Sequence, residues 1–123
     1  NYPYPKAIVQ GFMFFCSING FKSELINQIS SDHKLKKNMA YIVIKESDLV
    51  NLIKNIRLSK LELAKEIGVL SYNDTPLKEI LSEGISVIST DFKAMGNLAA
   101  VCILKKKNIL QKNKFRFIKR NSL

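Results

Sequence analysis

Histidine and cysteine are scarce in this chain, which has one histidine and two cysteines among 123 residues. Because His33 stands alone, neither a Ser-His-Asp triad nor a multi-histidine metal site can be assembled. Cys16 and Cys102 lie far apart, each inside an apolar segment, which favours reduced core thiols over a disulfide framework or a metal site. We therefore expect no metal, no cofactor and a cytoplasmic location.

Long hydrophobic runs are also missing, although 46% of the residues are apolar. The longest runs are only a few residues, so the sequence predicts neither a membrane span nor a signal peptide, and we expect no membrane partner. The five glycines are isolated from one another, which excludes a glycine-rich phosphate loop. The length is that of one domain with a core of its own.

Acidic residues are few, with 10 Asp and Glu against 20 Lys and Arg, and the net charge is +10. Between Lys105 and Arg120 there are eight basic residues and no acid. Such a run can bind nucleic acid or an anionic surface. Phe115, Phe117 and Ile118 are interleaved with the charges, so we favour the solvated face of a terminal helix and strand. Direct nucleic-acid binding stays the alternative.

Short apolar runs alternate with amphipathic segments along the chain. The apolar runs predict strands at 23–29, 40–44, 66–72, 85–89 and 115–120. Helical spacing and end signals predict helices at 5–19, 47–56, 74–84 and 91–104, with a loop or a single helical turn at 30–38. Short buried strands that alternate with helices indicate an α/β fold, a three-layer parallel sheet covered on both faces by right-handed crossovers.

Several of these helices carry recognisable end signals. Pro5 stands at a plausible first helical position, and Gly20 follows the end of the same helix. Ser47 and Asp48 are capping candidates for the second helix. The chain begins with Asn1 rather than Met, and on a helix rather than the strand that normally feeds one, so we expect a lobe of something larger.

The predicted helix 91–104 has an unusually wide apolar arc. One stripe and its flanks contain Phe92, Met95, Ala99, Cys102, Ile103, Ala94, Leu98 and Val101. An arc wider than the usual core-facing stripe means that the helix is deeply buried or shared with a second subunit. For the second case, the predicted dimer contacts are Phe92, Met95, Leu98 and Val101.

Polar residues follow three of the predicted strands. They are Lys45, Glu46, Tyr72, Asn73, Asp74, Ser89, Thr90 and Asp91. Loops after the carboxyl ends of parallel strands gather along one edge, where such folds bind ligands. Asn and Asp can each bond adjacent hydroxyl groups, and Tyr72 offers a flat face with a polar tip, which is the chemistry of a polyol or sugar site. Helix capping is the competing role, favoured for Thr75 and Asp91, whereas we favour a ligand for Asn73.

Two other functions are weaker. Ala64 and Gly68 have the spacing of a helix-turn-helix, but the residues that follow are β-rich and Pro76 would fall inside the recognition helix. An enzyme would need paired carboxylates, which Glu46 and Asp74 supply in principle, yet no second feature supports catalysis. We expect no enzymatic activity.

The stretch IGVLSYNDTPLKEILSEGISVISTDFKAMGNLAAVCIL, residues 67–104, resembles the end of a LacI-type effector-binding domain. The matching features are a Tyr72-Asn73-Asp74 turn after a strand, a helix opening Asp91-Phe92, and Met95-Gly96 followed by Ala99 and Ala100. The closing FRFIKRNSL resembles the family's last strand with its Arg-x-Ser ending. The stretches SYNDTPLKEI and GISVISTDF are similar to those of regulators that join a GntR-type winged helix to a LacI-like sensor domain.

The resemblance implies that residues 1–123 are the C-terminal lobe of an effector-binding and dimerisation domain, one lobe of a type I periplasmic-binding-protein-like fold, with the first lobe and the DNA-binding domain absent. It implies a homodimeric bacterial transcriptional regulator that senses a sugar or sugar derivative and reaches DNA through the absent domain. Asn73 and Glu46 are the first predicted ligand contacts, ahead of the others. Those are Lys45, Asp74, Tyr72 and Asp91.

Three positions depart from the family pattern. Ile8 stands where relatives often carry a ligand-binding arginine, Lys45-Glu46 replace an Asn-Asp pair, and Asn73 replaces an aspartate. These changes argue against an ordinary monosaccharide as the ligand.

Overall fold

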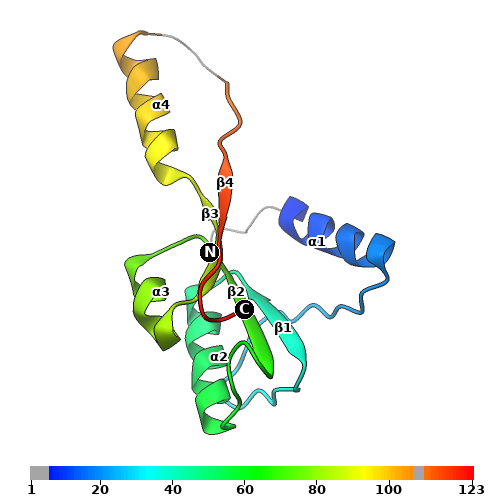
Figure 1. Ribbon diagram of the computed structural model, residues 1–123. Helices are drawn as coiled ribbons and strands as arrows, with labels where there is room; N and C mark the ends of the chain where they lie inside the picture. Colours follow the sequence, from blue (N-terminus) through cyan, green and yellow to red (C-terminus); the bar gives the residue numbers. More distant parts are fainter. Residues whose placement is uncertain (1–5, 107–109) are drawn as a thin grey trace.

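The computed structural model describes residues 6–106 and 110–123, and among them four strands form one sheet (Figure 1). The strands are β1 (Met39–Val43), β2 (Ile67–Tyr72), β3 (Ser86–Thr90) and β4 (Phe115–Ile118), in the order β1-β2-β3-β4. The first three are parallel, and β4 adds to β3 in the antiparallel sense. The predicted α/β class is confirmed, and β2 occupies the place where a helix-turn-helix would need its turn.

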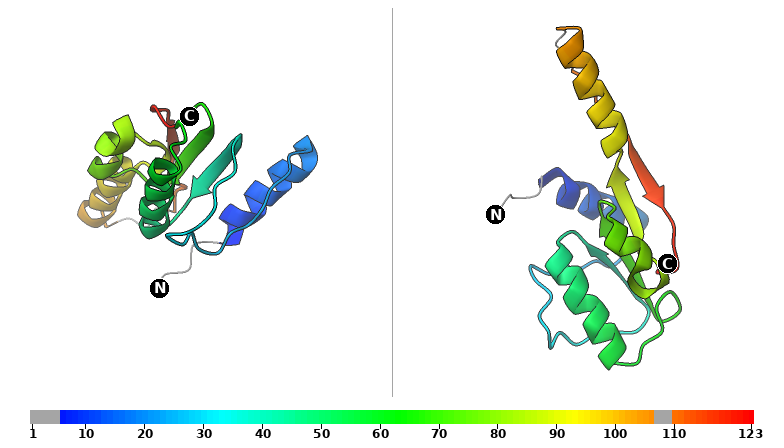
Figure 2. Two further views of the ribbon diagram at one scale, coloured as in Figure 1. Left: turned by 90° about the horizontal axis from the view of Figure 1, so that it is seen from below. Right: turned by 90° about the vertical axis from the view of Figure 1, so that its left-hand side faces the viewer.

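The helices are unevenly placed around this sheet (Figures 1 and 2). They are α1 (Lys6–Asn19), α2 (Glu46–Leu58), α3 (Pro76–Ile80) with the 3₁₀ turn η1 (Leu81–Glu83), and α4 (Phe92–Leu104). α2 and α3 lie together on one side of the sheet, and α1 lies beyond β1, apart from both (Figure 2, left). α4 extends past the end of β3, away from the other helices (Figure 2, right). Pro5, the predicted start of the first helix, lies outside the described residues.

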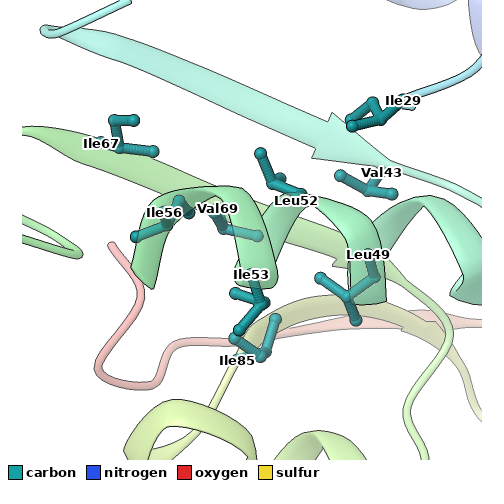
Figure 3. Close-up of a cluster of buried hydrophobic side chains, with 9 residues drawn as sticks. All are labelled: Ile29, Val43, Leu49, Leu52, Ile53, Ile56, Ile67, Val69 and Ile85. Carbon is teal, nitrogen blue, oxygen red and sulfur yellow. The ribbon is translucent and has the colours of Figure 1, made fainter. Parts of the chain in front are cut away.

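The core lies between α2 and the strands, as Figure 3 shows. Its buried members are Ile29, Val43, Leu49, Leu52, Ile53, Ile56, Ile67, Val69 and Ile85. The buried residues of α2 recur at helical spacing and share one face of the helix. Ile67 and Val69 are two residues apart and share one face of β2, and these two faces pack together. Each fully buried side chain of this size contributes about 1.5–3 kcal/mol.

The strand predicted at 23–29 is wrong, because side chains of α2 take over the hydrogen bonds that a strand would make. The Ile29 N–H donates to Asp48 Oδ1 at 3.2 Å. The Ile29 carbonyl accepts from Asn51 Nδ2 at 2.9 Å, and the next carbonyl along the chain accepts from Asn55 Nδ2 at 2.9 Å. Once these buried backbone groups are paired, the segment needs no neighbouring strand.

The predicted cap of α2 is also wrong. Lys45 occupies the N-cap position and makes no side-chain cap bond, and Ser47 and Asp48 lie inside the helix. Asp48 is buried, and its carboxylate accepts from the N–H of Ile29 rather than from an N–H of its own helix.

Two expectations of burial fail at the edges of the molecule. β1 is an edge strand rather than a fully buried one, and Ile42 is 51% exposed. No residue of α4 is buried, so deep burial of its wide apolar arc within this chain is wrong. Phe92 and Met95 are exposed and Leu98 is half-buried, and the use of this arc as a dimer surface stays a prediction.

Candidate functional site

The turn after β2, residues 72–75, is the centre of the candidate site and is called the site turn below. Asn73 has φ +58°, a left-handed conformation that asparagine tolerates better than most residues. Its N–H donates to the Ile88 carbonyl at 2.8 Å, and its Oδ1 accepts from the Thr90 N–H at 3.4 Å. The side-chain Nδ2 has no hydrogen-bond partner among the residues that the structure describes, so its two N–H donors are available.

Asp74, the next residue of the site turn, is paired within the chain. Arg120 donates to it twice, from Nη1 to Oδ1 at 2.9 Å and from Nη2 to Oδ2 at 2.7 Å. The Asp74 N–H donates to Ser89 Oγ at 3.0 Å. The Arg120 guanidinium holds the pKa of the Asp74 carboxyl below its ordinary value, so the carboxylate stays ionised.

Lys78 of α3 belongs to the candidate site, although the sequence did not suggest it. Its side chain is almost fully buried, with 3% of the residue exposed. Nζ donates to the Tyr72 carbonyl at 2.9 Å and to the Asn73 carbonyl at 2.7 Å. Burial lowers the pKa of Lys78, and the carboxylates of Glu46 and Asp74 act in the opposite direction. A lysine in a short polar helix gives no sequence signal of this role.

Lys45 and Glu46 lie at the start of α2 and are exposed. The negative charge of the Glu46 carboxylate raises the pKa of Lys78 and so partly offsets the effect of burial. Tyr72 ends β2 and is half-buried. The predicted ligand contacts that follow β1 and those at the end of β2 therefore lie at the same end of the sheet, as expected for the carboxyl ends of parallel strands.

Asp91 caps α4, which confirms the predicted capping role. Its Oδ1 accepts from the Ala94 N–H at 2.9 Å, and its Oδ2 accepts from Arg116 Nη2 at 2.5 Å. The Ala94 N–H is the main cause that lowers the pKa of Asp91, and Arg116 adds to it. Thr75, in contrast, stands at the N-cap position of α3 without a side-chain cap bond, so its predicted capping bond is wrong.

The basic run is less available than the sequence suggested. Arg116 and Arg120 are both paired with carboxylates, and the Arg120 side chain is only 16% exposed. Lys107 lies outside the described residues. The structure gives direct nucleic-acid binding no support beyond the charge itself.

A separate hollow of about 330 Å³ lies at the C-terminal end of α2. It is lined by Ile53, Ile56, Arg57, Leu61, Leu63, Ser82, Glu83 and Asn121, and contains none of the predicted ligand contacts. In residues 6–106 and 110–123, no three His, Cys, Asp or Glu side chains are grouped as a metal site would require. Nor is any helix of that part long and apolar enough to cross a bilayer.

Comparison with known proteins identifies the fold. No protein-family model and no curated protein matches the chain. A LacI-family transcriptional regulator from Lactobacillus casei with bound sucrose has a TM-score of 0.74 at 12% identity, over 100% of this chain and 53% of that one. The same regulator with bound glucose gives 0.73 at 13%, over 100% and 52%. The Lac repressor dimer bound to operator and the anti-inducer ONPF gives 0.56 at 19%, over 68% and 31%.

The predicted resemblance to LacI-type effector-binding domains is therefore confirmed at the level of the fold. The chain spans about half the length of the Lactobacillus casei structures that it matches. Identities of 12–19% carry no assignment of ligand or partner to this chain.

Proposed function

We propose that residues 1–123 form the C-terminal lobe of the effector-binding and dimerisation domain of a cytoplasmic, bacterial transcriptional regulator. The LacI-like fold over the whole chain supports this proposal. DNA is bound by a domain outside this chain, of the GntR winged-helix type, and the chain has no catalytic role. The observation that carries the proposal is the site turn at the carboxyl ends of the strands, where the side-chain Nδ2 of Asn73 is unpaired among the described residues.

The proposed ligand is a sugar, a sugar phosphate or a sugar acid. Asn73 supplies amide donors, and Lys45 and Glu46 supply an ammonium and a carboxylate from the start of α2. Lys45 and Glu46 are adjacent in the chain and both exposed, so both are accessible to hydroxyl or acidic groups of a ligand. Tyr72, Asp74 and Asp91 complete the proposed contact set, although the two carboxylates already have partners within the chain.

The proposed mechanism is a population shift. A ligand that favours one closure state of two lobes changes the spacing of the DNA-binding domains across a homodimer. The exposed arc of α4 is the proposed dimer surface in this chain. It contains Phe92, Met95, Leu98 and Val101.

Replacing Asn73 by glycine tests the ligand site, because glycine removes the side chain and accepts the positive φ. Asn38→Gly is the matched control, since Asn38 has φ +59° and precedes β1 at the opposite end of the sheet. Calorimetry of the intact protein against sugars, sugar phosphates and sugar acids should find a ligand whose affinity falls at least about tenfold in Asn73→Gly. Asn38→Gly should bind as the parent does. A panel without any binder, or full affinity in Asn73→Gly, refutes the proposal.

A further inference from the structure

The site turn is bound by two cations that lie outside it in the sequence. Lys78 of α3 binds its main-chain carbonyls, and Arg120, which follows β4, binds its carboxylate. Both cationic side chains are largely buried. Neither is needed to form the sheet ladder, since β2 and β3 pair through Leu70 to Tyr72.

Lys78 binds two successive carbonyls, an arrangement that the left-handed residue makes possible. In an extended strand successive carbonyls point to opposite sides of the chain. At Asn73 the positive φ turns the backbone, and the carbonyls of Tyr72 and Asn73 both come within 2.9 Å of one ammonium. The ammonium therefore stabilises the left-handed turn more than it would stabilise a continued strand.

Arg120 binds the other side of the turn in a geometry that only arginine supplies. Its two terminal nitrogens meet the two oxygens of Asp74, and Nη1 also donates to the Ile85 carbonyl at 2.9 Å. A Cβ added at Gly84 would lie 3.0 Å from Arg120 Cδ, so the arginine stem packs closely on the backbone there. A bidentate, partly buried pair fixes the angle as well as the distance between its partners.

We infer that Lys78 and Arg120 are positioning residues of the effector site, which hold the site turn so that the Asn73 side chain is presented to the ligand before the ligand arrives. This inference rests on the proposed function for the ligand and on the structure for the turn. Without Lys78 and Arg120, the Asn73 side chain would be held only by the 3.4 Å hydrogen bond that its Oδ1 accepts from the Thr90 N–H. Preorganisation of this kind lowers the ordering cost of binding.

Hydrogen exchange in the intact protein tests the positioning role without a ligand. Lys78→Met keeps a side chain of similar length and removes its hydrogen-bond donors. Arg120→Lys keeps the positive charge and removes the paired guanidinium donors that bind both oxygens of Asp74. Each variant should speed exchange of the amides of residues 73–75 by roughly ten- to a hundredfold and leave the amides of β1 unchanged. Unchanged exchange in the turn, or an equal rise in β1, overturns the inference, because the second result shows only general destabilisation.

Two control variants remove cationic side chains elsewhere in the chain. Lys37→Met removes the exposed pair with Glu66, and Arg116→Ala removes the pair with Asp91. Neither control should alter exchange of residues 73–75. If both controls speed exchange there as much as Lys78→Met does, the effect belongs to net charge and the positioning role is refuted.

Affinity then separates this inference from the proposed function. Glucose, sucrose and glucose 6-phosphate are titrated into the parent protein, Lys78→Met and Arg120→Lys. A probe that binds the parent should bind both variants at least about tenfold more weakly. An unchanged affinity overturns the inference even if exchange rises. If no probe binds the parent, these sugars are excluded as effectors, and the exchange result alone decides whether the two cations hold the turn.

Discussion

Ser122 joins two strands through its side chain, and its replacement by alanine gives the sharpest test of the packing. The Ser122 Oγ donates to the Val69 carbonyl at 2.6 Å and accepts from the Ser86 N–H at 2.7 Å. Pairing of β2 with β3 begins at Leu70 and Ser86, so Val69 lies just before the paired stretch. Ser122, Val69 and Ser86 are all fully buried, so the hydroxyl and its two partners are shielded from bulk water.

The expected loss follows from the two backbone groups that the alanine variant leaves unpaired. A buried donor or acceptor without a partner costs about 1–3 kcal/mol, so the Val69 carbonyl and the Ser86 N–H together cost about 2–6 kcal/mol. The Val69 N–H keeps its bond to the Ser122 carbonyl, which the substitution does not change. Some relaxation is expected, and we expect the free energy of unfolding to fall by about 2–4 kcal/mol.

Urea unfolding of the intact protein, followed by far-ultraviolet circular dichroism, measures this loss as a lower midpoint at an unchanged slope. Ser59→Ala is the control, because Ser59 is exposed at the end of α2 and should change the free energy of unfolding by no more than about 0.5 kcal/mol. If Ser122→Ala and Ser59→Ala unfold at the same urea concentration, the hydroxyl does not bridge the strands and the reasoning fails.

Three further substitutions test other parts of the structure. Arg120 lowers the pKa of Asp74 in the folded protein, so the ionised carboxylate stabilises the fold above its unfolded pKa. That stability is lost as the pH falls through the lower, folded pKa. Asp74→Asn should remove this part of the acid dependence when urea midpoints are compared from about pH 6 to about pH 3. Asn55→Ala should lower the free energy of unfolding by about 1–2 kcal/mol and speed proteolysis of the loop before β1, and an unchanged digest would contradict the bond from its amide. Gly84 has φ +109°, and a Cβ there would lie 3.0 Å from Arg120 Cδ, so Gly84→Ala should lower the free energy of unfolding by at least about 2 kcal/mol. Gly20 has φ +69° and open space around it, so Gly20→Ala should cost about 1 kcal/mol. Equal losses would show that the contact with Arg120 has no effect.

The regular elements could be predicted where one segment carries its own signal. β2, β3 and α4 begin and end within one residue of their predicted bounds, because apolar runs and helical spacing are local properties. The segment 23–29 has the same kind of apolar content, but its hydrogen bonds come from Asp48, Asn51 and Asn55 of α2. No local pattern shows that a helix will supply those partners, and the strand prediction failed for that reason.

The candidate site shows the same division between local and distant signals. The cap at Asp91 could be predicted because donor and acceptor are three residues apart. The Arg120–Asp74 pair joins residues 46 positions apart, and the sequence placed Arg120 in a solvated basic run. The role of Lys78 depends on a left-handed residue five positions earlier, which turns two carbonyls toward it. Such contacts arise only once the strands and helices are packed.

The sequence resemblance predicts an acid at the position of Asn73, and an amide differs from a carboxylate there in what it can bind. The Thr90 N–H can be met only by an oxygen, which fixes the Asn73 amide with Oδ1 toward β3. Nδ2 must then point away from that bond, and it offers two donors where a carboxylate would offer only acceptors. At the ligand contact proposed for Asn73, the group that meets Nδ2 must therefore contain an acceptor, such as a hydroxyl, carboxylate or phosphate oxygen. An effector whose only groups at this position are ammonium donors would suit an aspartate and not this chain.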